Sequence, residues 1–151
     1  MIRGIYVLYD DECGFCSRCA AWLRAQPSHV WVVCLPRSSE RIPKLFPGLR
    51  ELPRAELTVI DDQGGVYLGS NAWIVSLWAL RDWRAWSARL ASPTLRPMAR
   101  DIFELVSHNR ATISAALGLR GDAAVVQAVK AALPDGRHVR CEDGACAAGH
   151  G

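Results

Sequence analysis

The feature that most constrains the fold is the segment from Tyr6 to Cys19, with the sequence Tyr-Val-Leu-Tyr-Asp-Asp-Glu-Cys-Gly-Phe-Cys-Ser-Arg-Cys. Its apolar beginning predicts a strand, and the Ala-Ala-Trp-Leu-Arg-Ala that follows it predicts a helix. A redox dithiol places one sulfur at a helix N-terminus and the other about one turn further on. There, unpaired backbone N–H groups and the helix dipole favour thiolate over thiol. The order of strand, Cys-x-x-Cys and helix therefore predicts a redox-active dithiol.

Composition limits the class of protein. The chain has 151 residues, of which 50% are hydrophobic and 22% charged, as is typical of one globular domain. Its net charge is +3 and its arginines are scattered, so we expect no nucleic-acid partner. No apolar run approaches the ~18 residues of a membrane span. Residues 1–4 lead directly into a short strand, so we expect no secretory leader and a cytoplasmic location.

The remaining pattern predicts an α/β, thioredoxin-like fold with a four-stranded mixed sheet, helices on both faces and extra C-terminal helices. A strand, a helix and a strand of these lengths form a βαβ unit, whose two strands are parallel. The Asp-Gln-Gly-Gly sequence at 62–65 predicts a hairpin turn, and Ser70 or Asn71 is expected to be the next N-cap. The expected strands are 5–9, 30–35, 57–61 and 66–68, and the expected helices are 13–25, 40–46, 69–80, 98–117 and 122–133.

We divide the chain into a thioredoxin-like domain (1–118), an additional helix (119–134) and a flexible tail (135–151). Gly118 and Pro134 mark the two boundaries. The tail contains a set that could bind zinc, namely His138, Cys141, Cys146 and His150. The loose Cys-x4-Cys spacing among small residues favours incidental thiols instead.

Within the cysteine pair, we expect Cys13 to be the exposed nucleophile. Cys16 would be the resolving thiol that closes the Cys13–Cys16 disulfide. The helix N-terminus favours a Cys13 thiolate whereas the acids at 10–12 disfavour it, so the redox direction stays open. Cys19 follows at helical spacing and is expected to pack in the core. Cβ atoms three residues apart in a helix are ~5–6 Å apart, and a disulfide needs ~3.5–4.5 Å. A Cys16–Cys19 disulfide would therefore strain the helix, whereas Cys13 lies at the frayed end of the helix and can adjust. This difference selects Cys13 and Cys16 as the working pair.

Two alternatives use the same residues without catalysis. Cys-x-x-Cys-x-x-Cys is similar to the ligand run of iron–sulfur ferredoxins, but the usual fourth cysteine before a proline is missing, and only Cys34 remains. Alternatively, the cysteines bind zinc or are inert. Either way the chain would be a metal-binding or interaction module that uses the same cysteines. A third possibility is a thioredoxin-like binding scaffold with the region from Trp73 to Trp86 as its contact surface, although aromatic residues at this spacing are more often packing.

The segment 10–16, Asp-Asp-Glu-Cys-Gly-Phe-Cys, resembles the Asp-x-x-Cys-x-x-Cys signature of the DCC family of thiol-disulfide oxidoreductases. Gly-Ser-Asn-Ala at 69–72 is similar to the family's second landmark. Residues 97–103, followed by His-Asn-Arg at 108–110, are similar to its C-terminal helix. The resemblance covers about residues 4–118 and implies a thioredoxin-like fold with dithiol chemistry at Cys13 and Cys16. It implies Asp10 as the signature acid, which either sets the turn or moves protons to a buried Cys16.

The chain departs from the family pattern at two places. Asp11 stands where the family usually has glycine, which adds negative charge beside the nucleophile. The place of the cis-proline that precedes the third strand of a thioredoxin falls near residues 55–56, with Pro53 displaced upstream. Residues 119–151 lie outside the resemblance.

We expect no organic cofactor. The expected partners are a disulfide-containing protein or small thiol as substrate, and an electron donor.

Overall fold

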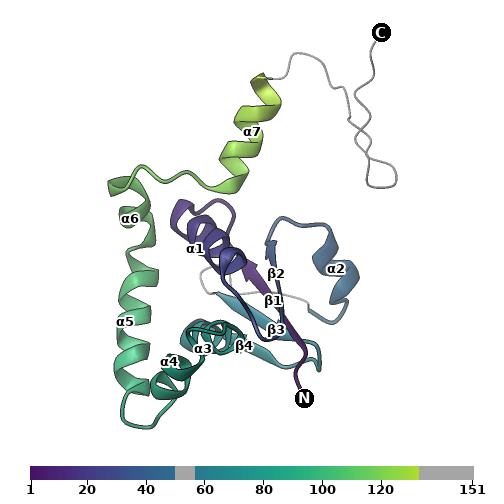
Figure 1. Ribbon diagram of the computed structural model, residues 1–151. Coiled ribbons are helices and arrows are strands. Elements are labelled where there is room, and N and C mark those ends of the chain that lie inside the picture. Colours follow the sequence, from purple (N-terminus) through teal and green to yellow (C-terminus); the bar gives the residue numbers. More distant parts are fainter. Residues whose placement is uncertain (50–56, 133–151) are drawn as a thin grey trace.

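The computed structural model describes residues 1–49 and 57–132. Its sheet has four strands in the order β2-β1-β3-β4, namely β1 (Gly4–Tyr9), β2 (Trp31–Pro36), β3 (Thr58–Asp61) and β4 (Val66–Leu68) (Figure 1). β1 pairs with β2 in parallel and with β3 antiparallel, and β3 pairs antiparallel with β4. The predicted parallel βαβ unit and the predicted hairpin are both confirmed.

β1 is an inner strand between β2 and β3, and its side chains alternate between the two faces of the sheet. Both faces are buried because helices cover them. Ile5 and Val7 belong to one apolar cluster, together with Leu23 of α1 (Gly14–Ala25). Leu8 belongs to a second cluster on the opposite face. The sheet therefore separates two apolar cores.

Helices cover both faces, as the sequence predicts. α1 and α3 (Gly69–Ala79) pack on the face of Ile5 and Val7, where Ala72 and Ala79 complete the larger core. The opposite face is covered by the short α2 (Arg41–Leu45), whose Ile42 packs in the cluster of Leu8. Figure 1 shows α2 on the far side of the sheet from α3.

The start of α3 differs from the prediction that Ser70 or Asn71 caps it. The N-cap is Leu68, and no side chain makes a capping bond. Gly69 has a φ of +56° and its N–H donates to the carbonyl oxygen of Leu57 at 3.0 Å, so β4 turns directly into the helix. Asn71 is already inside the helix, where its Oδ1 accepts a hydrogen bond from Arg96.

The predicted single helix over 98–117 is wrong. The chain after α3 forms α4 (Arg84–Leu90), α5 (Arg96–His108), α6 (Arg110–Ala116) and α7 (Asp122–Ala132). Asn109 separates α5 from α6: its side-chain Nδ2 donates to the carbonyl oxygen of Leu105 at 2.7 Å. An asparagine side chain that bonds to the backbone competes with continuation of the helix. Gly118, with a φ of +61°, ends α6 as predicted. Among the described helices, none is long and apolar enough to cross a membrane.

Candidate active site

Cys13 and Cys16 lie together at the beginning of α1. Cys13 is the N-cap residue, and its Sγ accepts a hydrogen bond from the Cys16 N–H at 3.2 Å. The Cys16 thiol also donates to Cys13 Sγ, with the two sulfurs 2.7 Å apart. Both are free, half-buried thiols. A small approach of the sulfurs would reach the ~2.05 Å of a disulfide bond.

Asp10 forms the turn that delivers Cys13 to the helix N-terminus. Its Oδ1 accepts a hydrogen bond from the Glu12 N–H at 3.1 Å, and its carbonyl oxygen accepts one from the Cys13 N–H at 3.3 Å. An aspartate side chain that bonds to the backbone two residues ahead is a common turn device. Its other carboxylate oxygen, Oδ2, is 3.2 Å from Nη1 of Arg110. Asp10 therefore connects the turn to a cation from a distant part of the chain.

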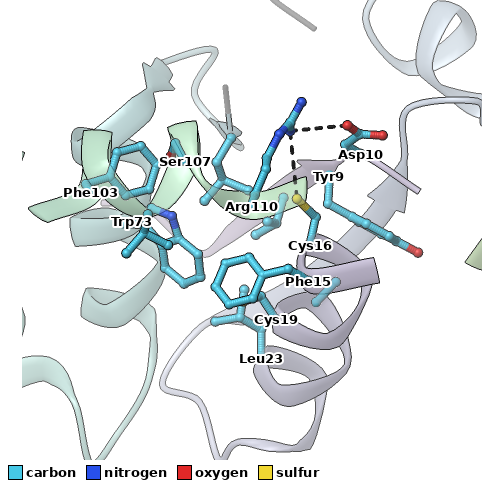
Figure 2. A pocket seen from close by; sticks show the side chains of 14 residues that line it. Tyr9, Asp10, Phe15, Cys16, Cys19, Leu23, Trp73, Phe103, Ser107 and Arg110 are labelled. Atoms are coloured by element: carbon cyan, nitrogen blue, oxygen red, sulfur yellow. Dashed lines mark hydrogen bonds and ion pairs between the residues drawn. The ribbon is translucent and has the colours of Figure 1, made fainter. Parts of the chain in front are cut away.

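Arg110 is the site residue that the sequence analysis missed. It is the first residue of α6, directly after the break at Asn109. The same Nη1 that pairs with Asp10 donates to Cys16 Sγ at 3.8 Å, and Figure 2 shows the guanidinium bridging the carboxylate and the sulfur. The available signal was the Asn-Arg pair in the family resemblance. Nothing in the sequence shows that Arg110 contacts Cys16, because the two residues are 94 positions apart.

The surroundings keep Cys16 and Cys19 protonated at neutral pH. The pKa of Cys16 is raised to about 12, mainly by burial and also by the hydrogen bond and the charge of Cys13, whereas Arg110 lowers it. Burial, with a smaller contribution from the charge of Cys13, raises the pKa of Cys19 to about 11. Cys34 lies on β2, and burial raises its pKa against the opposing effect of Arg24.

The two cysteines of the pair line different cavities. Cys16 and Cys19 line a narrow apolar cavity of about 50 Å³, whose aromatic walls are Phe15, Trp73 and Phe103 (Figure 2). Cys13 lines a separate cleft of about 340 Å³ between the first turn of α1 and α6. Asp10 and Arg110 line both spaces.

Of the four tryptophans in the region 73–86, two are packed and two are exposed, and Trp78 packs against the larger core. Trp73 packs edge-to-face on Phe103, with ring centroids 6.1 Å apart, and so joins α3 to α5 beside Cys16. Trp83 and Trp86 are exposed, Trp83 with its ring edge-to-face on Trp22. Packing, the preferred prediction, therefore describes Trp73 better than Trp86.

Asp11 does not place a free charge beside Cys13. Its side chain is buried, and its carboxylate accepts hydrogen bonds from the Ser38 hydroxyl at 2.6 Å and from the Ser38 N–H at 3.4 Å. The aspartate in place of the family's glycine thus connects the turn before α1 to the segment that follows β2. The Asp11 carboxylate is therefore hydrogen-bonded by Ser38.

The remaining predicted features fall partly outside the described residues. Over 1–49 and 57–132, no group of three or more His, Cys, Asp or Glu side chains is arranged to hold a metal ion. The tail set of His138, Cys141, Cys146 and His150 lies outside the described residues, as does the place at 55–56 where a thioredoxin has its cis-proline.

The sequence model of the DCC1-like thiol-disulfide oxidoreductase family matches residues 7–116. The chain belongs to this family. The matched region contains Cys13, Cys16, Asp10 and Arg110, and it ends before α7. No curated protein and no solved structure matches the chain. Membership in the DCC1-like family, together with the mixed four-stranded sheet, establishes the thioredoxin-like fold that the sequence predicts.

Proposed function

We propose that this DCC1-like protein is a thiol-disulfide oxidoreductase in which Cys13 attacks a substrate disulfide and Cys16 resolves the product. The observation that carries the proposal is the pair of free thiols 2.7 Å apart at the N-terminus of α1. Family membership supports the reaction class. The alternative of a metal site finds no ligand cluster among the described residues to favour it.

In the first step, the Cys13 thiolate attacks one sulfur of a substrate disulfide. A mixed disulfide forms between Cys13 and that sulfur, and the other substrate sulfur leaves as a thiolate. Hydrogen bonds from the Cys16 N–H and the Cys16 thiol stabilise negative charge on Cys13 Sγ before the attack. The cleft beside α6 is the space on which Cys13 opens.

The second step depends on the loss of negative charge from Cys13. While Cys13 carries negative charge, its hydrogen bond and its charge both raise the pKa of Cys16. Formation of the mixed disulfide removes that charge, and Arg110, 3.8 Å from Cys16 Sγ, remains to stabilise a Cys16 thiolate. Cys16 then attacks Cys13 Sγ, the Cys13–Cys16 disulfide forms, and the substrate leaves as a second thiol with the proton from Cys16. Two electrons have passed to the substrate.

The cycle closes when an external thiol reduces the Cys13–Cys16 disulfide. The proposal therefore needs an electron donor, such as a reductase or a low-molecular-weight thiol, and no organic cofactor. A cytoplasmic location would supply such thiols. In a more oxidising compartment, the same pair would run in the opposite direction and oxidise its substrate.

The test is thiol trapping and mass spectrometry of the protein across a series of dithiothreitol buffers. We expect a reversible two-electron transition that joins Cys13 to Cys16, and accumulation of mixed disulfides at Cys13 in the Cys16→Ser variant. Cys19→Ser is the matched control on the same helix and should leave the transition in place. Thiols that never pair, or that react only after a chelator is added, would overturn the proposal and favour a metal site.

A further inference from the structure

The segment 10–16, here called the redox turn, contains both cysteines of the pair and is contacted closely by residues 119–123, which lie beyond the family match. These five residues comprise the end of the connection from α6 and the first two residues of α7. We call these residues the C-terminal clamp. Figure 1 shows the α6–α7 connection passing beside the beginning of α1. The cysteines lie more than a hundred positions away in sequence. These contacts therefore exist only in the folded chain.

Two glycines show how close the clamp lies to the turn. A Cβ atom added to Gly121 would lie 2.4 Å from the Asp11 carbonyl oxygen and 2.5 Å from that of Glu12. A Cβ atom on Gly14, between the two cysteines, would lie 2.4 Å from the Leu119 carbonyl oxygen. All three distances are to backbone atoms, which cannot rotate away. The clamp and the Cys-x-x-Cys turn are in direct backbone contact.

Hydrogen bonds fix this contact from both sides. The Ala123 N–H donates to the Asp11 carbonyl oxygen at 3.0 Å, and the Asp122 N–H donates to Ser17 Oγ at 3.0 Å. The Asp122 carboxylate accepts a hydrogen bond from the Tyr9 hydroxyl at 2.7 Å. The clamp thus bonds to the end of β1, to the acidic turn and to the first turn of α1.

The α6 helix contributes a further bond beside the clamp. The Phe15 N–H, between the two cysteines, donates to Ser114 Oγ at 2.9 Å. The N–H of Cys16, the next residue, is bonded to Cys13 Sγ. The backbone on which both sulfurs are carried is therefore bonded to residues from the C-terminal part of the chain.

We infer that the C-terminal clamp, with Gly121 and Asp122 as positioning residues, sets the reduction potential of the Cys13–Cys16 pair by holding the redox turn in the closed geometry. The inference rests on the proposed function. A turn held with its sulfurs 2.7 Å apart loses little conformational freedom when the disulfide closes. Loosening the turn increases that loss, so the disulfide becomes less stable relative to the dithiol. Cys16 also reaches a mixed disulfide at Cys13 less often.

The experiment measures the equilibrium between the Cys13–Cys16 disulfide and dithiothreitol in the full chain, for wild type and for Gly121→Ala and Asp122→Ala. We expect the equilibrium constant for disulfide formation to fall about tenfold in Gly121→Ala, which corresponds to a reduction potential about 30 mV less negative. Asp122→Ala should show a smaller shift in the same direction. Asp122→Asn, whose amide oxygen can still accept from Tyr9, should restore most of the wild-type value.

Gly48→Ala is the matched control, because a Cβ atom there meets nothing within 4 Å. Circular dichroism at the temperature of the redox measurement shows which variants are folded, and Asp122→Ala decides the question if Gly121→Ala does not fold. A folded clamp variant with a wild-type equilibrium constant overturns the inference, as does an equal shift in Gly48→Ala. If the wild-type cysteines never pair, the proposed function itself fails, which is a separate result.

Discussion

The two faces of the sheet differ in what they bury. The face covered by α2 has an apolar cluster of Leu8, Leu35, Ile42 and Ile60, with Tyr6 edge-to-face on Phe46 at 5.1 Å. Its buried hydroxyl, that of Thr58 opposite Leu8, accepts a hydrogen bond from Arg37 at 3.4 Å. The face covered by α1 and α3 has an apolar core of similar kind around Ile5 and Val7. Near the beginning of α1, however, it also has two thiols with raised pKa values and a cation.

This difference between the two faces indicates where the fold can place reactive groups. α1 begins at the end of a buried strand, so its free N–H groups lie beside a turn that other helices can reach. α2 has five residues and no side chain caps it, so it offers only apolar cover. Both faces therefore contribute to stability, and the proposed redox chemistry belongs to the face covered by α1 and α3.

The largest expected effect is on the α2 face. Ile60 is 3% exposed, so Ile60→Ala should lower the free energy of unfolding by about 2–5 kcal/mol through lost burial and a residual cavity. Leu45→Ala on the exposed side of α2 is the control, with an expected loss below about 1 kcal/mol. Urea denaturation measures both. The comparison of the two faces fails if Ile60→Ala also shifts the Cys13–Cys16 equilibrium while the protein remains folded.

The next effect is on the dithiol face. Arg110→Gln removes the cation beside Cys16, so the Cys16 thiolate should form less readily and the mixed disulfide at Cys13 should resolve about tenfold more slowly. Arg110→Lys keeps a positive charge and should recover part of the rate. Stopped-flow mixing with a small disulfide, followed by acid quench, gives the resolution rate. An unchanged rate in Arg110→Gln would mean that Arg110 only supports Asp10.

The smallest effect is on pH dependence. Folding raises the pKa of Cys16 from 9.0 to about 12, mainly by burial, so the folded dithiol form binds this proton more tightly than the unfolded chain. The resulting stabilisation is complete below pH 9 and is lost as pH rises towards 12. Reduced wild type should therefore lose stability more steeply over this range than reduced Cys16→Ser. Denaturation at several pH values measures both slopes, and equal slopes would contradict the burial of Cys16.

The sequence determined the elements whose signals are local. The apolar run of β1, the helix after Cys13 and the hairpin at 62–65 were predicted because each depends on residues next to one another. The helix over 98–117 was mispredicted because its apolar pattern continues through Asn109, whereas the side chain of that residue bonds to the backbone and ends α5. Alternation and spacing do not reveal a bond that competes with the helix.

For the site, the sequence by itself determined the place of the cysteine pair at a helix N-terminus, since Cys-x-x-Cys stands between a strand and a helix. Only the tertiary structure decided what surrounds it. Arg110 reaches Cys16, Asp11 turns to Ser38, and Asp122 reaches Tyr9 through contacts between residues far apart in the chain. The pKa value of a buried thiol depends on its burial and on the charged groups beside it in the folded protein. Neither can be inferred from the residues adjacent to the cysteine in the sequence.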